Sequence, residues 1–181
     1  MEGGKPLMQV LKDRKSSRAF STKKLPERVL GNLLWAAFGI NRPDNGHRTA
    51  PSAVNWQEID IYAATADGLY LYEAKGHTLQ PVFAGDIRAE TGKQPFVKDA
   101  PVELIYVADY SRMGKGAEEE KNVYSAADTG FISENVYLFC ASEGWATVVR
   151  GAVDKAALAK AMKLRPDQKI ILAQTVGYPK K

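Results

Sequence analysis

The chain has 181 residues, of which 45% are hydrophobic and 25% charged. This is the composition of an ordinary globular domain, and it excludes long disorder and collagen-like repeats. The longest apolar runs, such as 33–38, are far too short to cross a bilayer, so no membrane partner is expected. A single cysteine, Cys140, excludes an internal disulfide framework and a cysteine zinc cluster. We predict one domain over residues 1–181.

The net charge of +4 comes from 25 basic and 21 acidic residues. The basic residues are spread along the chain rather than gathered in a dense patch, which argues against a nucleic-acid partner. A small anionic ligand such as a phosphate is the more economical interpretation. Because the chain is free of disulfides and Met1–Pro6 has no apolar signal core, a cytoplasmic location is expected. The alternative is an exported or periplasmic protein whose leader has been removed.

In the N-terminal half, the spacing of apolar residues predicts two helices followed by an antiparallel meander. Apolar residues recur with helical spacing in two segments, and Pro26 suits the first turn of the second. Further along, apolar and polar residues alternate with the period of a strand. In chain order we expect a helix at 7–14, a helix from 25 to Gly39, a loop at 42–46, and strands at 58–65, 68–73 and 78–83.

The C-terminal half predicts a long helix between strands. We expect strands at 102–108, 146–149 and 170–176, and helices at 117–143 and 154–162. The long helix is apolar around much of its circumference, so a sheet and helices or a second subunit must cover several of its sides. It also carries a stripe of small residues, namely Ala126, Ala127, Gly130 and Ser133. Helices with a mainly antiparallel sheet, and no regular βαβ alternation, indicate an α+β fold.

Several common catalytic motifs are absent from the sequence. It has no G-x-G-x-x-G fingerprint, no phosphate-binding P-loop and no G-x-S-x-G nucleophile elbow. His47 and His77 do not form a metal-ligand spacing, and Cys140 lies among apolar residues of the long helix. We therefore predict neither a metal site nor a catalytic nucleophile.

A first polar cluster, Arg14–Phe20, directly follows the first helix. Arg14, Lys15, Ser16 and Arg18 place three cations and a hydroxyl within five residues. Arginine offers a planar fork to phosphate oxygens and serine adds a neutral donor, so the cluster is suited to an anion. The alternative is a solvated basic helix end, which the helix dipole favours.

A second polar cluster leads into the first strand of the meander. Its candidate residues are Pro51, Ser52, Asn55 and Gln57. The side-chain amides of Asn55 and Gln57 can read the donor and acceptor edge of a heterocycle. The alternative is an ordinary turn in which Ser52 caps a short helix.

A third cluster, Val149, Arg150 and Gly151, lies at the end of a strand. Glycine permits close approach of a flat ligand, to which exposed backbone amides can donate. The alternative is a plain connection between a strand and a helix.

Taken in order, these clusters resemble the FMN-binding segments of the nitroreductase-like flavoprotein superfamily. RKSSRAF resembles that family's Arg-x-Ser-x-(Arg/Lys)-x-Phe signature, and RTAPSAVNWQ its Pro-Ser-x-x-Asn segment. TVVRGAVD resembles the segment that passes the flavin edge, and VGYPKK the terminal Gly-Tyr-Pro. The stretches LLWAAFGI and GLYLYEAKGHTLQPV are especially similar to the azoline (thiazole/oxazole-forming) dehydrogenase subgroup.

The resemblance implies a nitroreductase-like fold with FMN as cofactor and a role for each candidate residue. Arg14, Lys15 and Ser16 would hold the phosphate and ribityl region, and Arg18 would lie by the N1–C2 edge. Val149, Arg150 and Gly151 would pass the N5–O4 edge, to which Arg150 and Gly151 would offer backbone amides. Lys180 would add a phosphate contact. Gln57 would be a further cofactor-binding residue. Members of the family are homodimers, so the partner subunit would supply Pro51, Ser52 and Asn55, and the long helix would lie at the interface.

The resemblance also implies an FMN-dependent oxidoreductase that alternates between NAD(P)H and a small organic acceptor such as a nitroaromatic or quinone. One alternative is a flavin-binding or flavin-handling protein without NAD(P)H turnover, in which Arg150 closes the reductant site. Another is an azoline-type dehydrogenase, although residues 121–124 lack the basic stretch typical of that subgroup. A basic nucleic-acid binder is the weakest alternative.

Overall fold

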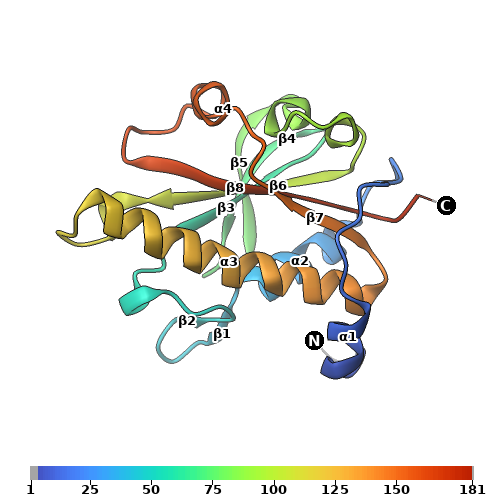
Figure 1. Cartoon of the computed structure of the whole chain (residues 1–181), viewed down its shortest axis with the longest axis horizontal. Helices are drawn as coiled ribbons and strands as arrows, with labels where there is room; N and C mark the ends of the chain where they lie inside the picture. Colours follow the sequence, from blue (N-terminus) through green and yellow to red (C-terminus); the bar gives the residue numbers. More distant parts are fainter. Residues whose placement is uncertain (1–3, 181) are drawn as a thin grey trace.

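The computed structural model describes residues 4–180 and places a twisted sheet between two layers of helices (Figure 1). Met1–Gly3 and Lys181, the two ends of the predicted domain, lie outside the described residues. The helices are α1 (Leu7–Asp13), α2 (Glu27–Phe38), α3 (Glu118–Glu143) and α4 (Lys155–Ala161). Short 3₁₀ turns are η1 (Ala53–Asn55), η2 (Arg88–Thr91), η3 (Pro95–Lys98) and η4 (Tyr110–Arg112).

The main sheet has six strands in the order β5-β4-β3-β6-β8-β7, and every neighbouring pair is antiparallel. The strands are β3 (Ile59–Ala64), β4 (Gly68–Glu73), β5 (Thr78–Ala84), β6 (Val102–Asp109), β7 (Ala146–Arg150) and β8 (Gln168–Gly177). All residues of the central strand β6 are buried, as expected for a strand covered on both faces. The predicted α+β class and meander are confirmed.

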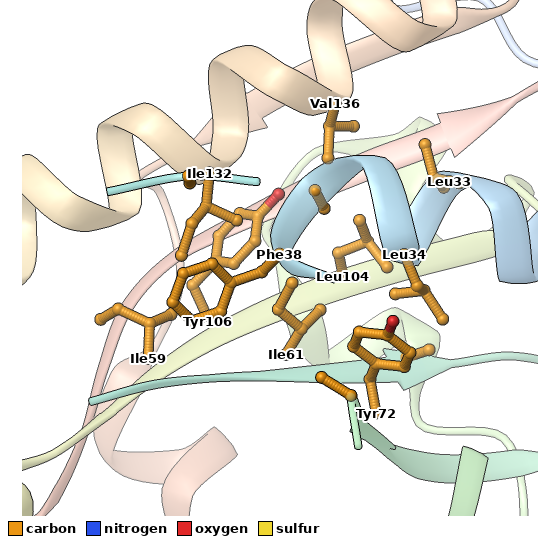
Figure 2. Packing of buried hydrophobic residues seen from close by; sticks show 14 of the residues in the cluster. Leu33, Leu34, Phe38, Ile59, Ile61, Tyr72, Leu104, Tyr106, Ile132 and Val136 are labelled. Atoms are coloured by element: carbon orange, nitrogen blue, oxygen red, sulfur yellow. The ribbon is translucent and has the colours of Figure 1, made fainter. Parts of the chain in front are cut away.

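Helices α2 and α3 cover one face of the sheet, and α4 covers the other (Figure 1). Figure 2 shows the core under α2 and α3, where Phe38 and Ile132 meet Tyr106 of the sheet. The opposite core packs Leu158 and Met162 against the other face. Helix α3 therefore lies across one face of the sheet, and β7 forms the edge of the sheet near this helix.

Local sequence signals set most element boundaries. Gly39 is the C-cap of α2, and Gly144 ends α3 in the left-handed conformation, with φ of 74°, which glycine adopts at little cost. Asp154 caps α4 by accepting the Ala157 N–H at 3.1 Å. The predicted loop at 42–46 proves to be the turn of a small hairpin, β1 (Ile40–Arg42) with β2 (His47–Arg48), which was not predicted.

Within residues 4–180, no helix is both long and apolar enough to cross a membrane.

Candidate functional site

Tyr137 of α3 joins the first and third sequence clusters. Its hydroxyl lies 2.8 Å from the Ser16 Oγ and accepts the Val149 N–H at 2.9 Å. The Arg14 guanidinium lies over the tyrosine ring, 5.2 Å from its centre. A buried helix residue therefore positions the arginine and serine of the basic cluster beside the end of β7.

Two further backbone contacts bring the ends of the chain to the same place. The Ser17 N–H donates to the Thr147 carbonyl at 2.9 Å, which ties the basic cluster to the free edge of β7. The Lys180 N–H donates to the Ala19 carbonyl at 3.1 Å, and Phe20 pairs with Pro179. The main chain of Lys180 is thus held at Ala19, the residue that follows Arg18.

The basic cluster has the charge of an anion site. Lys15, Arg18 and Lys180 are exposed, and Arg14 is half-buried. Among residues 4–180, no carboxylate lies within salt-bridge distance of any of these four cations. Positive charge held close together without a counter-ion favours binding of an anion.

The Arg150 side chain is turned into the protein, away from the third cluster. It is only 5% exposed, pairs with Glu103 of β6, and donates to the Thr175 Oγ1 at 3.0 Å and the Thr91 carbonyl at 2.9 Å. Gly92 leaves the necessary room, because a Cβ there would lie 1.8 Å from the Arg150 Nη1. The hypothesis that this side chain closes a reductant site is therefore wrong.

Two residues of the third cluster are accessible from solvent. Gly151 is exposed and Val149 is half-buried. The Val149 N–H is already bonded to Tyr137, so it is not free for a ligand. A Cβ on Gly151 would meet nothing closer than 3.8 Å, so the surface above its backbone is open. A flat ligand can approach the chain there.

The second cluster lies elsewhere. The Ala53 N–H of η1 donates to the Asp128 Oδ2 at 2.9 Å, close to the middle of α3. Asp128 precedes Tyr137 by nine residues, or about 13 Å along a helix. Figure 1 shows the first cluster and α1 by the C-terminal end of α3, and the β1–β2 hairpin and η1 toward its other end. One chain therefore does not bring the first and second clusters together.

The segment Ser52–Gln57 has an unusual and well-braced backbone. Val54, Asn55 and Gln57 all adopt positive φ, at 46°, 57° and 49°, a region that non-glycine residues seldom occupy. Ser52 does not form the predicted cap of η1; its hydroxyl instead accepts the Gln57 N–H at 3.0 Å. Pro51 and Asn55 are exposed at its surface.

Gln57 is less available than predicted. Its amide nitrogen donates to the Gly46 carbonyl at 3.2 Å and to the Asn55 Oδ1 at 3.0 Å. Its oxygen accepts from the Arg48 Nε at 2.8 Å. Because both N–H groups are engaged within the chain, Gln57 braces the β1–β2 hairpin and has no free donor for a heterocycle.

Two buried carboxyl groups lie behind this segment. Glu58 is fully buried and Asp128 is 2% exposed. Burial, followed by the neighbouring Asp128 charge, raises the pKa of Glu58 to about 7. Burial also raises the pKa of Asp128, against the Ala53 N–H that stabilises its charge. A carboxyl at the start of β3 is thus poised to hold a proton near neutral pH.

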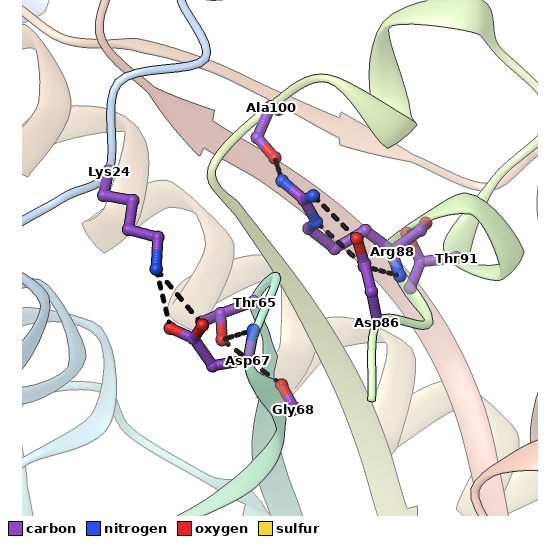
Figure 3. Close-up of polar contacts among 8 residues, drawn as sticks. All are labelled: Lys24, Thr65, Asp67, Gly68, Asp86, Arg88, Thr91 and Ala100. Atoms are coloured by element: carbon purple, nitrogen blue, oxygen red, sulfur yellow. Dashed lines mark hydrogen bonds and ion pairs between the residues drawn. The ribbon is translucent and has the colours of Figure 1, made fainter. Parts of the chain in front are cut away.

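A cavity of about 770 Å³ contains none of the predicted site residues. It lies between α2 and the sheet, with Leu30, Leu34 and Tyr72 among its lining residues. Figure 3 shows polar contacts at its margin, where Lys24 pairs with Asp67 and Arg88 with Asp86. In each pair the opposite charges neutralise each other, so two of the cations that line the cavity are already compensated.

Tyr137 and Asp128 are the residues that the sequence analysis missed. Both lie inside the long helical pattern, and nothing in their spacing separates them from core residues. Only the packing of α3 against β7 and η1 gives them their contacts.

The sheet, the long helix across it and the paired termini define an α+β protein of the nitroreductase fold. The chain belongs to the nitroreductase family, whose model matches residues 11–178. It is an oxidoreductase of that family.

Three relatives illustrate this membership. A Methanocaldococcus jannaschii protein assigned as a nitroreductase, MJ1384, is 31% identical over 81% of this chain and 78% of its own length. The crystal structure of a protein assigned as a nitroreductase from Ralstonia eutropha JMP134 is 43% identical, with a TM-score of 0.95 over 100% of this chain and 86% of that one. A protein assigned likewise from Desulfovibrio desulfuricans, in complex with FMN, shares the fold at 21% identity, with a TM-score of 0.70 over 99% of this chain and 89% of its own.

Proposed function

We propose that the protein is a homodimeric, FMN-dependent oxidoreductase whose sites each draw residues from both subunits. The observation that carries this proposal is the gathering of Arg14–Arg18, Gly151 and Lys180 at one end of α3. We propose the cofactor FMN, the homodimer and the reactants as parts of the same hypothesis.

The residues present fit FMN. Its phosphate carries up to two negative charges, which match the uncompensated cations Arg14, Lys15 and Lys180, and Ser16 adds a hydroxyl donor. The open backbone at Gly151 suits the edge of a flat ring. The FMN complex of the Desulfovibrio desulfuricans protein supports the same cofactor.

When bound, FMN supplies the hydride chemistry, and the protein supplies binding, orientation and electrostatics. Arg18 would place a fixed positive charge by the N1–C2 edge, which stabilises negative charge there and raises the reduction potential. The Gly151 amide would donate to the opposite edge. We propose NAD(P)H as the reductant and a small organic molecule, such as a nitroaromatic or a quinone, as the acceptor.

The exposed apolar surface supports a dimer. The large hydrophobic side chains that are exposed in the single chain lie on α1, α3 and η1, except for Val82; they are Leu7, Met8, Leu11, Val54, Val123, Tyr124 and Phe131. The small residues Ala126, Ala127 and Gly130 of α3 are exposed beside them. A second copy that covers this surface would bury apolar area and bring its own Ser52–Gln57 segment to the basic cluster.

The two alternatives have less support. A flavin carrier without NAD(P)H turnover was considered because Arg150 could close the reductant site. The buried Arg150 side chain does not reach the surface, so it gives this alternative no support. For an azoline-type dehydrogenase, residues 121–124 lie in the first turns of α3, where Lys121 and Asn122 contact Tyr110 rather than the basic cluster.

Subunit complementation tests the shared site. Arg14→Ala removes a phosphate contact, and Asn55→Asp places a negative charge where the partner's flavin is expected, at an exposed residue that keeps an acceptor for Gln57. Each homodimer should lose FMN. Random reassortment of the two variants should restore about a quarter of the wild-type FMN sites, because half of the dimers are mixed and each has one intact site. No recovery would overturn the two-subunit site.

Anaerobic mixing with NADH or NADPH tests turnover. We expect the yellow colour of the FMN-loaded protein to bleach with at least one of them and to return on addition of a quinone or nitroaromatic. Persistent colour with both would favour the carrier instead.

A further inference from the structure

The carboxyl group of Glu58 lacks the set of hydrogen-bond donors that a buried carboxylate needs. It is fully buried, and neither of its oxygens has a hydrogen-bond partner among the described residues. A buried carboxylate without donors is strongly disfavoured, because it loses hydration and gains nothing in return. The group must either take up a proton or find a partner.

Asp128 is that partner. Its carboxyl is close enough to Glu58 to raise the pKa of that group, and its Oδ2 already accepts the Ala53 N–H at 2.9 Å. If Glu58 carries a proton, its O–H donates to Asp128, which keeps its charge and its bond to Ala53. If Glu58 loses that proton, two buried negative charges face each other.

Arg112 offsets this repulsion only in part. Arg112 of η4 is the positive group facing Glu58, but its Nη2 donates to the Glu58 main-chain carbonyl at 2.7 Å and pairs with Asp60 at 2.7 Å. On α3, Asp128 is the charged neighbour, and the buried Thr129 hydroxyl beside it forms no hydrogen bond within residues 4–180. The proton is therefore the available means of neutralising the pair.

The pair is placed to act on Ser52–Gln57. Asp128 holds the amide of Ala53, next to the left-handed Val54 and Asn55, and Glu58 directly follows Gln57. Strained backbone persists only where its surroundings hold it in place. Repulsion that shifts Asp128 would release the Ala53 amide and relax this segment.

We propose that Glu58 and Asp128 share one proton and, in that form, position Ser52–Gln57 for the flavin of the partner subunit, so that loss of the proton weakens FMN binding. The flavin part of this inference rests on the proposed function. Glu58 and Asp128 are positioning residues, since they act through the segment rather than on the cofactor.

The test compares wild type with Glu58→Gln, whose amide donates to Asp128 at every pH. FMN dissociation constants would be measured by quenching of flavin fluorescence between about pH 6 and about pH 8. With the Glu58 pKa near 7, the ratio of the wild-type constant to that of Glu58→Gln should rise from near one to about tenfold. Ionisation of the FMN phosphate affects both proteins alike and cancels in the ratio.

Two further variants sharpen the result. Asp128→Asn supplies Glu58 with an amide donor and still accepts from Ala53, so it should also flatten the pH dependence. Glu90→Gln makes the same chemical change at an exposed position of η2 and should retain the wild-type profile. A flat ratio for Glu58→Gln would overturn the positioning role.

Urea denaturation of the FMN-free protein separates this proposal from the proposed function. Because the folded pKa is raised, the wild type should lose stability relative to Glu58→Gln as pH rises from about 4.5 to about 7. Absence of that trend would overturn the shared proton. If no variant binds FMN at any pH, the proposed function and the flavin part fall, while the denaturation result still decides the shared proton.

Discussion

Replacing Tyr137 by phenylalanine should loosen the candidate site without disturbing the core. The change removes one hydroxyl, which lies 2.8 Å from Ser16 Oγ and 2.9 Å from the Val149 nitrogen. Ser16 is exposed and can bond to water instead, so its loss is small. Val149 is half-buried, and its unpaired N–H carries most of the cost. We expect the free energy of unfolding to fall by about 1–2 kcal/mol.

FMN affinity should fall as well, although Tyr137 donates no charge. Ser16 would lose the hydroxyl that holds it, while the phenylalanine ring still lies under Arg14. Ordering one such side chain on binding costs about 0.5–1 kcal/mol, which corresponds to a roughly two- to fivefold rise in the dissociation constant. Urea denaturation of the FMN-free protein and flavin-fluorescence titration measure the two effects.

The matched control is Tyr70→Phe, which removes a hydroxyl in β4 that forms no hydrogen bond within residues 4–180. It should change neither quantity appreciably. If Tyr137→Phe were as stable as wild type and bound FMN equally well, the reasoning that Tyr137 organises the cluster would be refuted. Reduced stability with unchanged affinity would leave it a purely structural residue.

Three other changes probe the interior. Arg150→Ala leaves Glu103 buried without its partner and should cost about 3–5 kcal/mol in urea denaturation; a cost near zero would contradict a buried ion pair. Gly92→Ala should cost about 1–3 kcal/mol, because its Cβ collides with the Arg150 guanidinium, and unchanged stability would argue against that close approach. Burial raises the pKa of the Cys140 thiol, so a thiol reagent should modify it only after unfolding; rapid labelling of the native protein would show otherwise.

The hydrophobic periodicity of the sequence was sufficient to predict the fold, because each helix or strand buries residues at a regular spacing. In α3 the buried residues recur at helical spacing, and in β3 every residue except Asp60 is buried because helices cover both faces of the sheet. The hairpin β1–β2 escaped prediction because its strands have three and two residues, too short for a period to be recognised. Prediction of one domain over residues 1–181 remains a prediction.

The proximity of some candidate residues was predictable where local sequence determines it, while their role in binding a cofactor stays a prediction. A dense group of cations after a helix indicates an anion site whatever it packs against, and the structure holds Arg14 and Ser16 together as expected. Arg150 was misjudged because its direction depends on Glu103, which lies 47 residues away on a strand separated from β7 by β8. Contacts between residues so far apart in the sequence cannot be recognised from residue spacing or composition.

The position of the second cluster is the reason why we propose a site shared between two subunits. Asp128 and Tyr137 lie about 13 Å apart along α3, and the exposed Gly130 and Phe131 lie between them. If two copies pack α3 against α3 about a two-fold axis at this exposed stretch, the Asp128 end of one helix lies beside the Tyr137 end of the other. Each Ser52–Gln57 segment then reaches the partner's basic cluster. The same geometry makes the Glu58–Asp128 proton of one subunit act on the flavin held by the other, so flavin binding and dimer formation should depend on each other.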